Sequence, residues 1–241
     1  MIGGFIITGN APKKVLVRAL GPSLASFGIT NFVPDPLLQL RSQSGALLAQ
    51  NDNWKDSQQA EIEATGLAPS DDREAVIIAT LNPGQYTGLL TNKLGDPGIG
   101  TFELYDLNLG SDSELANIST RGIVLSGNNV MIAGFTLGNG IAPTNLAVRA
   151  RGPSLSNFFG NVLADPTLEL RDANGALIKA NDDWQDDPVS AALLTANGLA
   201  LSDPKESGIF LSLIAPGQYT AIVAGKAGGT GIALVEIYNL R

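Results

Sequence analysis

Residues 1–24 contain the stretch MIGGFIITGN…VLVRALGPSL, and a close copy of it, MIAGFTLGNG…LAVRARGPSL, occupies residues 131–155. The blocks that follow each copy match in the same order, and the offset between the copies drifts only from 130 to 133 residues. Self-similarity of this kind is typical of tandem repeats, in which each copy folds as one structural unit. The sequence therefore predicts two units of one design.

The matched blocks have the character of short strands joined by turns. In residues 15–19, Val15, Val17 and Ala19 share one face, and their counterparts in the second copy are also apolar, so we expect this face to point into the core. The opposite face carries arginine, and two cross-strand ion pairs are expected there: Arg18 with Glu103 and Arg149 with Glu236. Pro-Gly at residues 83–84 and 216–217 predicts type II turns, and Asn-Gly at residues 174–175 predicts a hairpin.

Each copy also contains one short helical pattern. Asp187, Pro188 and Gly198 fit the N-cap, the first helical position and the left-handed residue that closes a helix. In the first copy we expect Asp56 or Ser57 to cap the helix and Gly66 to close it. We therefore predict an all-β fold of two tandem antiparallel β-sandwich domains, each with one short helix.

The predicted domains are a first β-sandwich repeat over residues 1–109, a linker plus strand over residues 110–130, and a second repeat over residues 131–241. The predicted strand, ISTRGIVL at residues 118–125, stands just ahead of the second copy and has no counterpart ahead of the first. The first repeat is thus expected to lack its first strand.

Composition excludes several classes of protein. The net charge of -8 lacks the basic footprint of a nucleic-acid binder. There is no Cys and no His, so thiol chemistry and the commonest general base are excluded. No apolar run approaches a membrane span, and the N-terminal stretch has no basic region of the kind that opens a signal peptide. We predict an extracellular or cell-surface location, with the export signal outside this chain.

Three blocks of the second copy look familiar: LADPTLELRDANGALIKANDDW, LIAPGQYTAIVAG and GIALVEIYNL. They resemble tandem repeats of large secreted or surface-attached bacterial proteins, and are distantly similar to bacterial pre-peptidase C-terminal (PPC) domains. The resemblance covers nearly the whole chain. It implies a jelly-roll-like β-sandwich and a structural, adhesive or accessory role. Some pre-peptidase relatives bind calcium, but no individual ligand is carried over from them.

The Asn- and Asp-rich loops are the best candidates for a metal site, because calcium prefers six to eight oxygen ligands from a flexible loop. The alternative is that these side chains cap the helices and form Asx turns. The second copy is richer in carboxylates, so it is the better candidate if only one copy binds. The candidate ligands are Asn181, Asp182, Asp183, Asp186 and Asp187, with Asp52 and Asn53 in the first copy.

Other polar and aromatic residues have a functional and a structural interpretation. Trp54 and Trp184, the only tryptophans, could stack on a sugar if exposed, or could anchor the helix by packing. The serine of GPSL has no base near it, so we read that motif as a turn. The acidic residues at 71–74 and 203–206 are expected to form solvated loops.

The leading functional hypothesis is a non-enzymatic structural repeat that associates with itself or with neighbouring repeats, by strand complementation into a filament. The alternative is a calcium-dependent or carbohydrate-binding adhesion module, whose partner would be a glycan. An enzyme ranks last, because nothing in the sequence places two carboxylates about a cleft.

Overall fold

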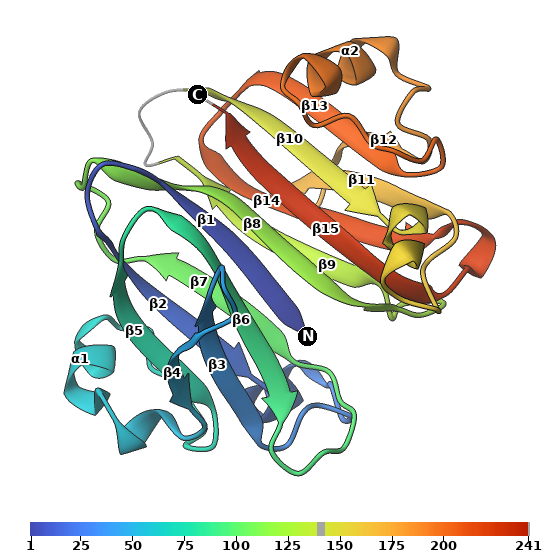
Figure 1. Ribbon diagram of the computed structural model, residues 1–241. Coiled ribbons are helices and arrows are strands. Elements are labelled where there is room, and N and C mark those ends of the chain that lie inside the picture. The colour runs from blue at the N-terminus through green and yellow to red at the C-terminus, as the bar shows by residue number, and fades with distance from the viewer. Residues whose placement is uncertain (139–142, 241) are drawn as a thin grey trace. The chain divides into compact units, whose positions relative to one another are not determined.

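The computed structural model describes residues 1–138 and 143–240. Residues 139 and 140, which end the quoted opening stretch of the second repeat, lie outside the described part of the chain. Strands dominate, and the chain divides into two compact units, Met1–Ala116 and Asn117–Arg241. The all-β prediction is confirmed (Figure 1).

The second unit is an eight-stranded jelly roll. Its two sheets have the orders β13-β10-β15-β8 and β12-β11-β14-β9, and all their pairings are antiparallel. Eight antiparallel strands that cross between two facing sheets form the double Greek key of this architecture. The strands are β8 (Ser113–Val124, of which residues 117–124 belong to this unit), β9 (Met131–Leu137), β10 (Thr144–Arg151), β11 (Pro166–Asp172), β12 (Leu177–Asn181), β13 (Ser207–Ile214), β14 (Gly217–Gly225) and β15 (Gly231–Leu240).

The first unit has the same strand order with one strand fewer. Its sheets are β5-β2-β7 and β4-β3-β6-β1, so each strand has a counterpart among β9 to β15. The place that β8 takes beside β15 has no equivalent beside β7 among the described residues. The strands are β1 (Ile2–Gly9), β2 (Lys13–Leu20), β3 (Pro36–Ser42), β4 (Leu47–Asn51), β5 (Ala75–Leu81), β6 (Gly84–Asn92) and β7 (Thr101–Asp106).

The space between the sheets holds the main core of each unit. Leu146, Val148 and Ala150 pack there in the second unit, and Val15, Val17 and Ala19 are buried at the matching positions of the first. The face predicted to point inward therefore does so in both units.

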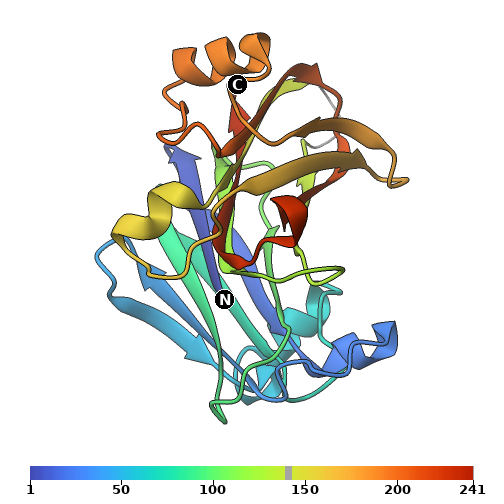
Figure 2. The same cartoon turned by 90° about the vertical axis from the view of Figure 1, so that its right-hand side faces the viewer.

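The opposite face of the same strands is also covered, which the sequence did not predict. In the first unit, Leu16 is buried beneath η2 (Trp54–Asp56) and α1 (Gln59–Ala64), in a cluster with Trp54 and Ile62. In the second unit α2 (Pro188–Ala196) covers Ala147 in the same way, and Figure 2 shows this helix as a layer outside the strands of its own unit. Three layers, rather than two, make up each unit.

The local predictions at helix ends and turns have mixed outcomes. Asp187 caps α2 by accepting hydrogen bonds from the backbone N–H groups of Val189 and Ser190, as predicted. The first helix differs, because its N-cap is Gln58 in the left-handed region and neither predicted cap residue serves. The predicted type II turn at Pro83-Gly84 is wrong: Gly84 has φ of 158° where such a turn needs about 80°, and it opens β6.

The remaining turns show why their motifs recur. Gly175 has φ of 78° in the β11–β12 hairpin, as the Asn-Gly pair predicts. The GPSL motifs begin two short 3-10 helices, η1 (Pro22–Phe27) and η3 (Pro153–Asn157). Among the described residues η2 is also a 3-10 helix, and a fourth such segment, η4 (Lys226–Gly228), precedes β15. No helix in residues 1–138 and 143–240 combines the length and the apolar character that a membrane span requires.

Candidate functional site

The outer edge of β7 is one difference between the two units. Within the described residues β7 pairs only with β2, whereas its counterpart β15 pairs with β10 on one side and with β8 on the other. All six residues of β7 are half-buried, while Val235, Glu236 and Ile237 of β15 are buried. A strand with one unpaired side presents a row of N–H and C=O groups to any extended chain.

The other edge of the same sheet is closed by side chains in both units. The Gln58 amide donates to the carbonyl of Ile78 at 2.9 Å and accepts from its N–H at 3.0 Å, so it mimics a neighbouring strand. Asn51 Oδ1 accepts from the Val76 N–H at 2.9 Å. In the second unit, Ser190 and Asn181 make the corresponding bonds to Phe210 and Gly208 on β13. Edges blocked in this way resist strand addition.

Phe102 on β7 fills the core differently from its counterpart Val235. Its ring lies over Gly3 and Gly88, which pair with each other across β1 and β6. A Cβ added at Gly88 would lie 2.1 Å from Phe102 Cε2, and one added at Gly3 would lie 2.3 Å from Phe102 Cδ1. In the second unit the matching residues are valine over the cross-strand pair Ala133 and Ala221.

The candidate metal ligands of the second unit come together only in part. One carboxylate oxygen from each of Asp182, Asp183 and Asp186 lies within 4.8 Å of the others. Lys226 Nζ lies 2.7 Å from Asp182 Oδ2 and 4.0 Å from Asp183 Oδ2, so a cation already faces this group. Its hydrogen bond to Asp182 lowers the pKa of that carboxyl group.

The first unit repeats the lysine–aspartate contact without the full carboxylate group. Lys93 Nζ contacts Asp52 and lowers the pKa of its carboxyl group. Asn53 stands where the second copy has Asp183, and its amide donates to Asp56 Oδ2 at 3.3 Å. The two lysines were not singled out from the sequence, because each lies about 40 residues from its partner.

Asp187 and Asn181 hold backbone in place. Asp187 caps α2 and contacts Lys179, and the hydrogen bond from Lys179 is the main reason that its pKa falls to about 2. The Asn181 amide donates to the Asp183 carbonyl at 2.9 Å and its oxygen accepts from Gly208. For these two residues the structure agrees with the capping and Asx alternative.

Of the two interpretations of Trp54 and Trp184, burial favours packing over sugar stacking. Both side chains are buried in the outer clusters, with 4% and 7% of their surface exposed. The Trp54 indole N–H donates to the Asp71 carbonyl at 3.2 Å. A buried indole has no free face for a sugar ring, so packing accounts for both residues.

The most buried acidic residues were predicted to lie in solvated loops, which is wrong. Glu74 and Glu206 are fully buried. Glu74 Oε1 accepts hydrogen bonds from the N–H groups of Gly21 and Ser23 and from the Ser23 hydroxyl, at 2.6 to 3.1 Å. Glu206 does the same with Gly152 and Ser154. The GPSL serine is therefore a donor that fixes a turn.

The predicted ion pairs are present and are more enclosed than expected. Arg18 Nε lies 2.5 Å from Glu103 Oε2, and Arg149 Nη2 lies 2.6 Å from Glu236 Oε2. Each guanidinium also donates to a loop carbonyl, that of Leu67 or Leu199. These arginines tie the loop after each helix to the sheet.

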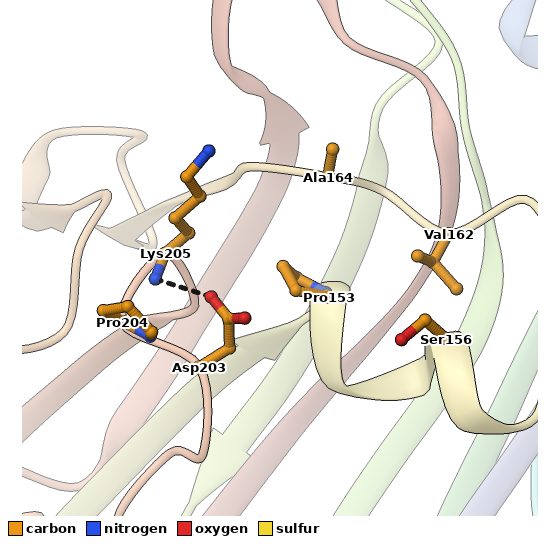
Figure 3. A pocket seen from close by; sticks show the side chains of 7 residues that line it. All are labelled: Pro153, Ser156, Val162, Ala164, Asp203, Pro204 and Lys205. Carbon is orange, nitrogen blue, oxygen red and sulfur yellow. Dashed lines mark hydrogen bonds between the residues drawn. The ribbon is translucent and has the colours of Figure 1, made fainter.

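A pocket of ≈ 480 Å³ lies beside η3 in the second unit (Figure 3). Asp203 accepts a hydrogen bond from the backbone N–H of Lys205 at 3.0 Å, so its carboxylate completes a turn. Among the lining residues there is neither a pair of carboxylates nor a base beside Ser156. The lining consists of Pro153, Ser156, Val162, Ala164, Asp203, Pro204 and Lys205.

No family model and no curated protein matches the chain, so the resemblance to pre-peptidase domains extends no further than the all-β fold. Similar solved structures include the major capsid protein P2 from bacteriophage PM2, with 9% identity and a TM-score of 0.26 over 100% of this chain and 92% of that chain. The MCP of STIV, Sulfolobus turreted icosahedral virus, has 11% identity and a TM-score of 0.29 over 98% of this chain and 91% of that chain.

A protein from Eubacterium rectale whose name suggests secretion has 9% identity and a TM-score of 0.22, over 98% of this chain and 69% of that chain. Because all of these TM-scores lie below 0.5, we base the jelly-roll assignment on the strand order of each unit.

Proposed function

We propose that the chain is a non-enzymatic structural repeat of an extracellular or cell-surface assembly, joined to its neighbour at the outer edge of β7. The observation that carries this proposal is the unpaired side of β7 within the described residues, at the position where the second unit holds residues 117–124 of β8. Extended chains bind such edges through backbone hydrogen bonds. A contact between two different surfaces propagates into a filament unless it closes into a ring.

The use of polar residues supports a structural role. The buried carboxylates Glu74 and Glu206 both accept hydrogen bonds from backbone and serine donors of a turn. Arg18 and Arg149 both link a strand to a loop. Because each bond occurs at the same place in both units, these side chains are explained by the fold that the repeats share.

Amide hydrogen exchange on the full chain tests the proposal, with β15 as the internal reference for β7. In the monomer we expect the β7 amides to exchange faster than those of β15, and to become protected when the protein associates with its neighbour, whether that is a second copy or another polypeptide. Light scattering and negative-stain microscopy would follow the association. Equal protection of β7 and β15 in the monomer would show that the edge is closed and would refute the proposal.

Calcium binding by the second unit is the second candidate, favoured by the proximity of the Asp182, Asp183 and Asp186 carboxylates. The matched variant is Asp183→Asn, which gives the second copy the residues of the first. Calorimetry with calcium should show a heat of binding that this variant loses. No heat with the wild-type chain would remove the candidate.

A further inference from the structure

The strand order points to a particular partner for the β7 edge. Resting on the strand-addition function proposed above, we infer that the edge binds an antiparallel strand of the β8 type, supplied from outside residues 1–241. Such a strand is extended, and at every second position it carries a small or aliphatic residue that faces the core.

The register of this strand follows from the second unit. β7 has the same register against β2 as β15 has against β10, because Arg18 lies opposite Glu103 just as Arg149 lies opposite Glu236. On the outer side of β15, Ile118 lies opposite Ile237 and Thr120 lies opposite Val235. The offset of 133 places the same two positions opposite Leu104 and Phe102 of β7. We expect an aliphatic residue opposite Leu104.

The residue opposite Phe102 is expected to be small. Phe102 is larger than Val235 and already reaches across both Gly3 and Gly88. In the second unit the residue at this position of β8 is Thr120. Val124, four residues further along β8 and on the same face, is fully buried. The partner strand thus completes a core that β7 leaves half-covered, with a register fixed by alternation of its side chains.

A polar residue gives the partner strand a second point of recognition. The Asn117 amide donates to the Ile237 carbonyl at 2.9 Å, and this asparagine is buried. The matching acceptor on the first unit is the carbonyl of Leu104. By contrast, Arg121 lies over the Phe159 ring, 4.3 Å from its centroid, and this ring belongs to a loop whose length differs between the two copies. An arginine is therefore not required.

A second copy of this chain is the less favourable source of the strand. Its residues 117–124 already pair with its own β15. If residues 117–124 of one copy moved to the β7 edge of another copy, they would leave their own β15 unpaired. The number of paired edges would not change. A strand that lies outside residues 1–241 and is otherwise unpaired gains the full set of bonds.

The test uses the full chain and a fluorescein-labelled peptide of residues 113–126. Fluorescence polarisation measures binding, and hydrogen exchange measures protection of β7 against the reference β15. One control peptide carries Ile118→Asp and Val124→Asp, which removes the core-facing residues. The other carries Thr120→Pro, which removes a backbone donor. We expect saturable binding of the native peptide, protection of β7, and at least tenfold weaker binding of both controls.

A chain extended by residues 117–130 ahead of Met1 provides a second variant, in which the edge is filled internally. It should not bind the peptide, and the first unit should melt at a higher temperature. Equal binding of all three peptides, or binding without protection of β7, would overturn the inference. If β7 became protected only by self-association, this inference would fail and the proposed function would stand. If β7 were already protected in the monomer, both would fail.

Discussion

The glycine pair beneath Phe102 allows the packing of the first unit to be tested against that of the second. Gly88→Ala and Gly3→Ala would place a methyl carbon 2.1 and 2.3 Å from ring atoms of Phe102. Overpacking of this kind costs about 1–3 kcal/mol. The same substitution at an unhindered site commonly stabilises by about 0.4–1 kcal/mol, because it restricts the unfolded chain. The expected sign at these two positions is therefore opposite to the usual one.

Phe102→Val alone should also destabilise the unit, because it leaves a cavity above two glycines. The cost should be below the ~3–5 kcal/mol of Phe→Ala, since valine retains part of the side chain and Phe102 is half-buried. The triple variant, which combines Phe102→Val with both glycine-to-alanine changes, has the set of side chains found in the second unit. We expect it to recover most of the loss, with a coupling free energy of about 2 kcal/mol.

Denaturant-dependent hydrogen exchange read by mass spectrometry would measure these changes, since it follows each unit separately. Val235→Phe in the second unit is the reverse test, and should destabilise that unit because its ring would meet Ala133 and Ala221. If Gly88→Ala costs the same in the Phe102→Val background as in the wild-type chain, the ring contact is not the cause and the reasoning is refuted.

Three further predictions concern polar residues of the fold. Glu74→Ala should destabilise the first unit by about 3 kcal/mol or more, because several buried donors lose their acceptor. Glu206→Ala should destabilise the second unit in the same way. A loss of stability below about 1 kcal/mol in urea titrations would contradict this prediction. The folded pKa of Asp187 is about 2, below its usual 3.8, so its contribution to stability is present above pH ~4 and is lost as the pH falls toward about 2. Asp187→Asn should flatten that part of the stability–pH curve. An unchanged slope would count against this prediction. Lys13→Thr should destabilise the first unit by about 3 kcal/mol, because it leaves Asp106 without its buried cation. Adding Asp106→Asn gives the first unit the neutral pair that Thr144 and Asn239 form in the second unit, and should restore most of the lost stability. Thermal melts in which the double variant is no more stable than the single variant would contradict this prediction.

Local patterns predicted much of this structure because the repeat shows each pattern twice. The inward face of β2 and β10, the Arg–Glu pairs and the caps of α2 depend on alternation and on nearby residues, and all are present. These features follow from periodicity that can be read along a single segment.

The predictions that fail do so for one physical reason, which is contact between segments that are distant in the sequence. Leu16 lies on the face that alternation assigns to solvent, but a helix folded back from residues 59–64 buries it. Glu74 is buried against hydrogen-bond donors that lie more than 50 residues earlier in the chain, so its own segment does not reveal them. Gln58 leaves helical geometry because its side chain bonds to β5. Neither spacing nor charge within one segment reports such partners.

The side chains that close β5 and β13 have a consequence for any array built from these units. Terminal repeats of a linear array usually need a polar outer face of their own for solubility. Here Gln58 and Asn51 in the first unit, and Ser190 and Asn181 in the second, give every unit a finished flank of its own. An array extended through β7 would therefore not branch at β5 or β13.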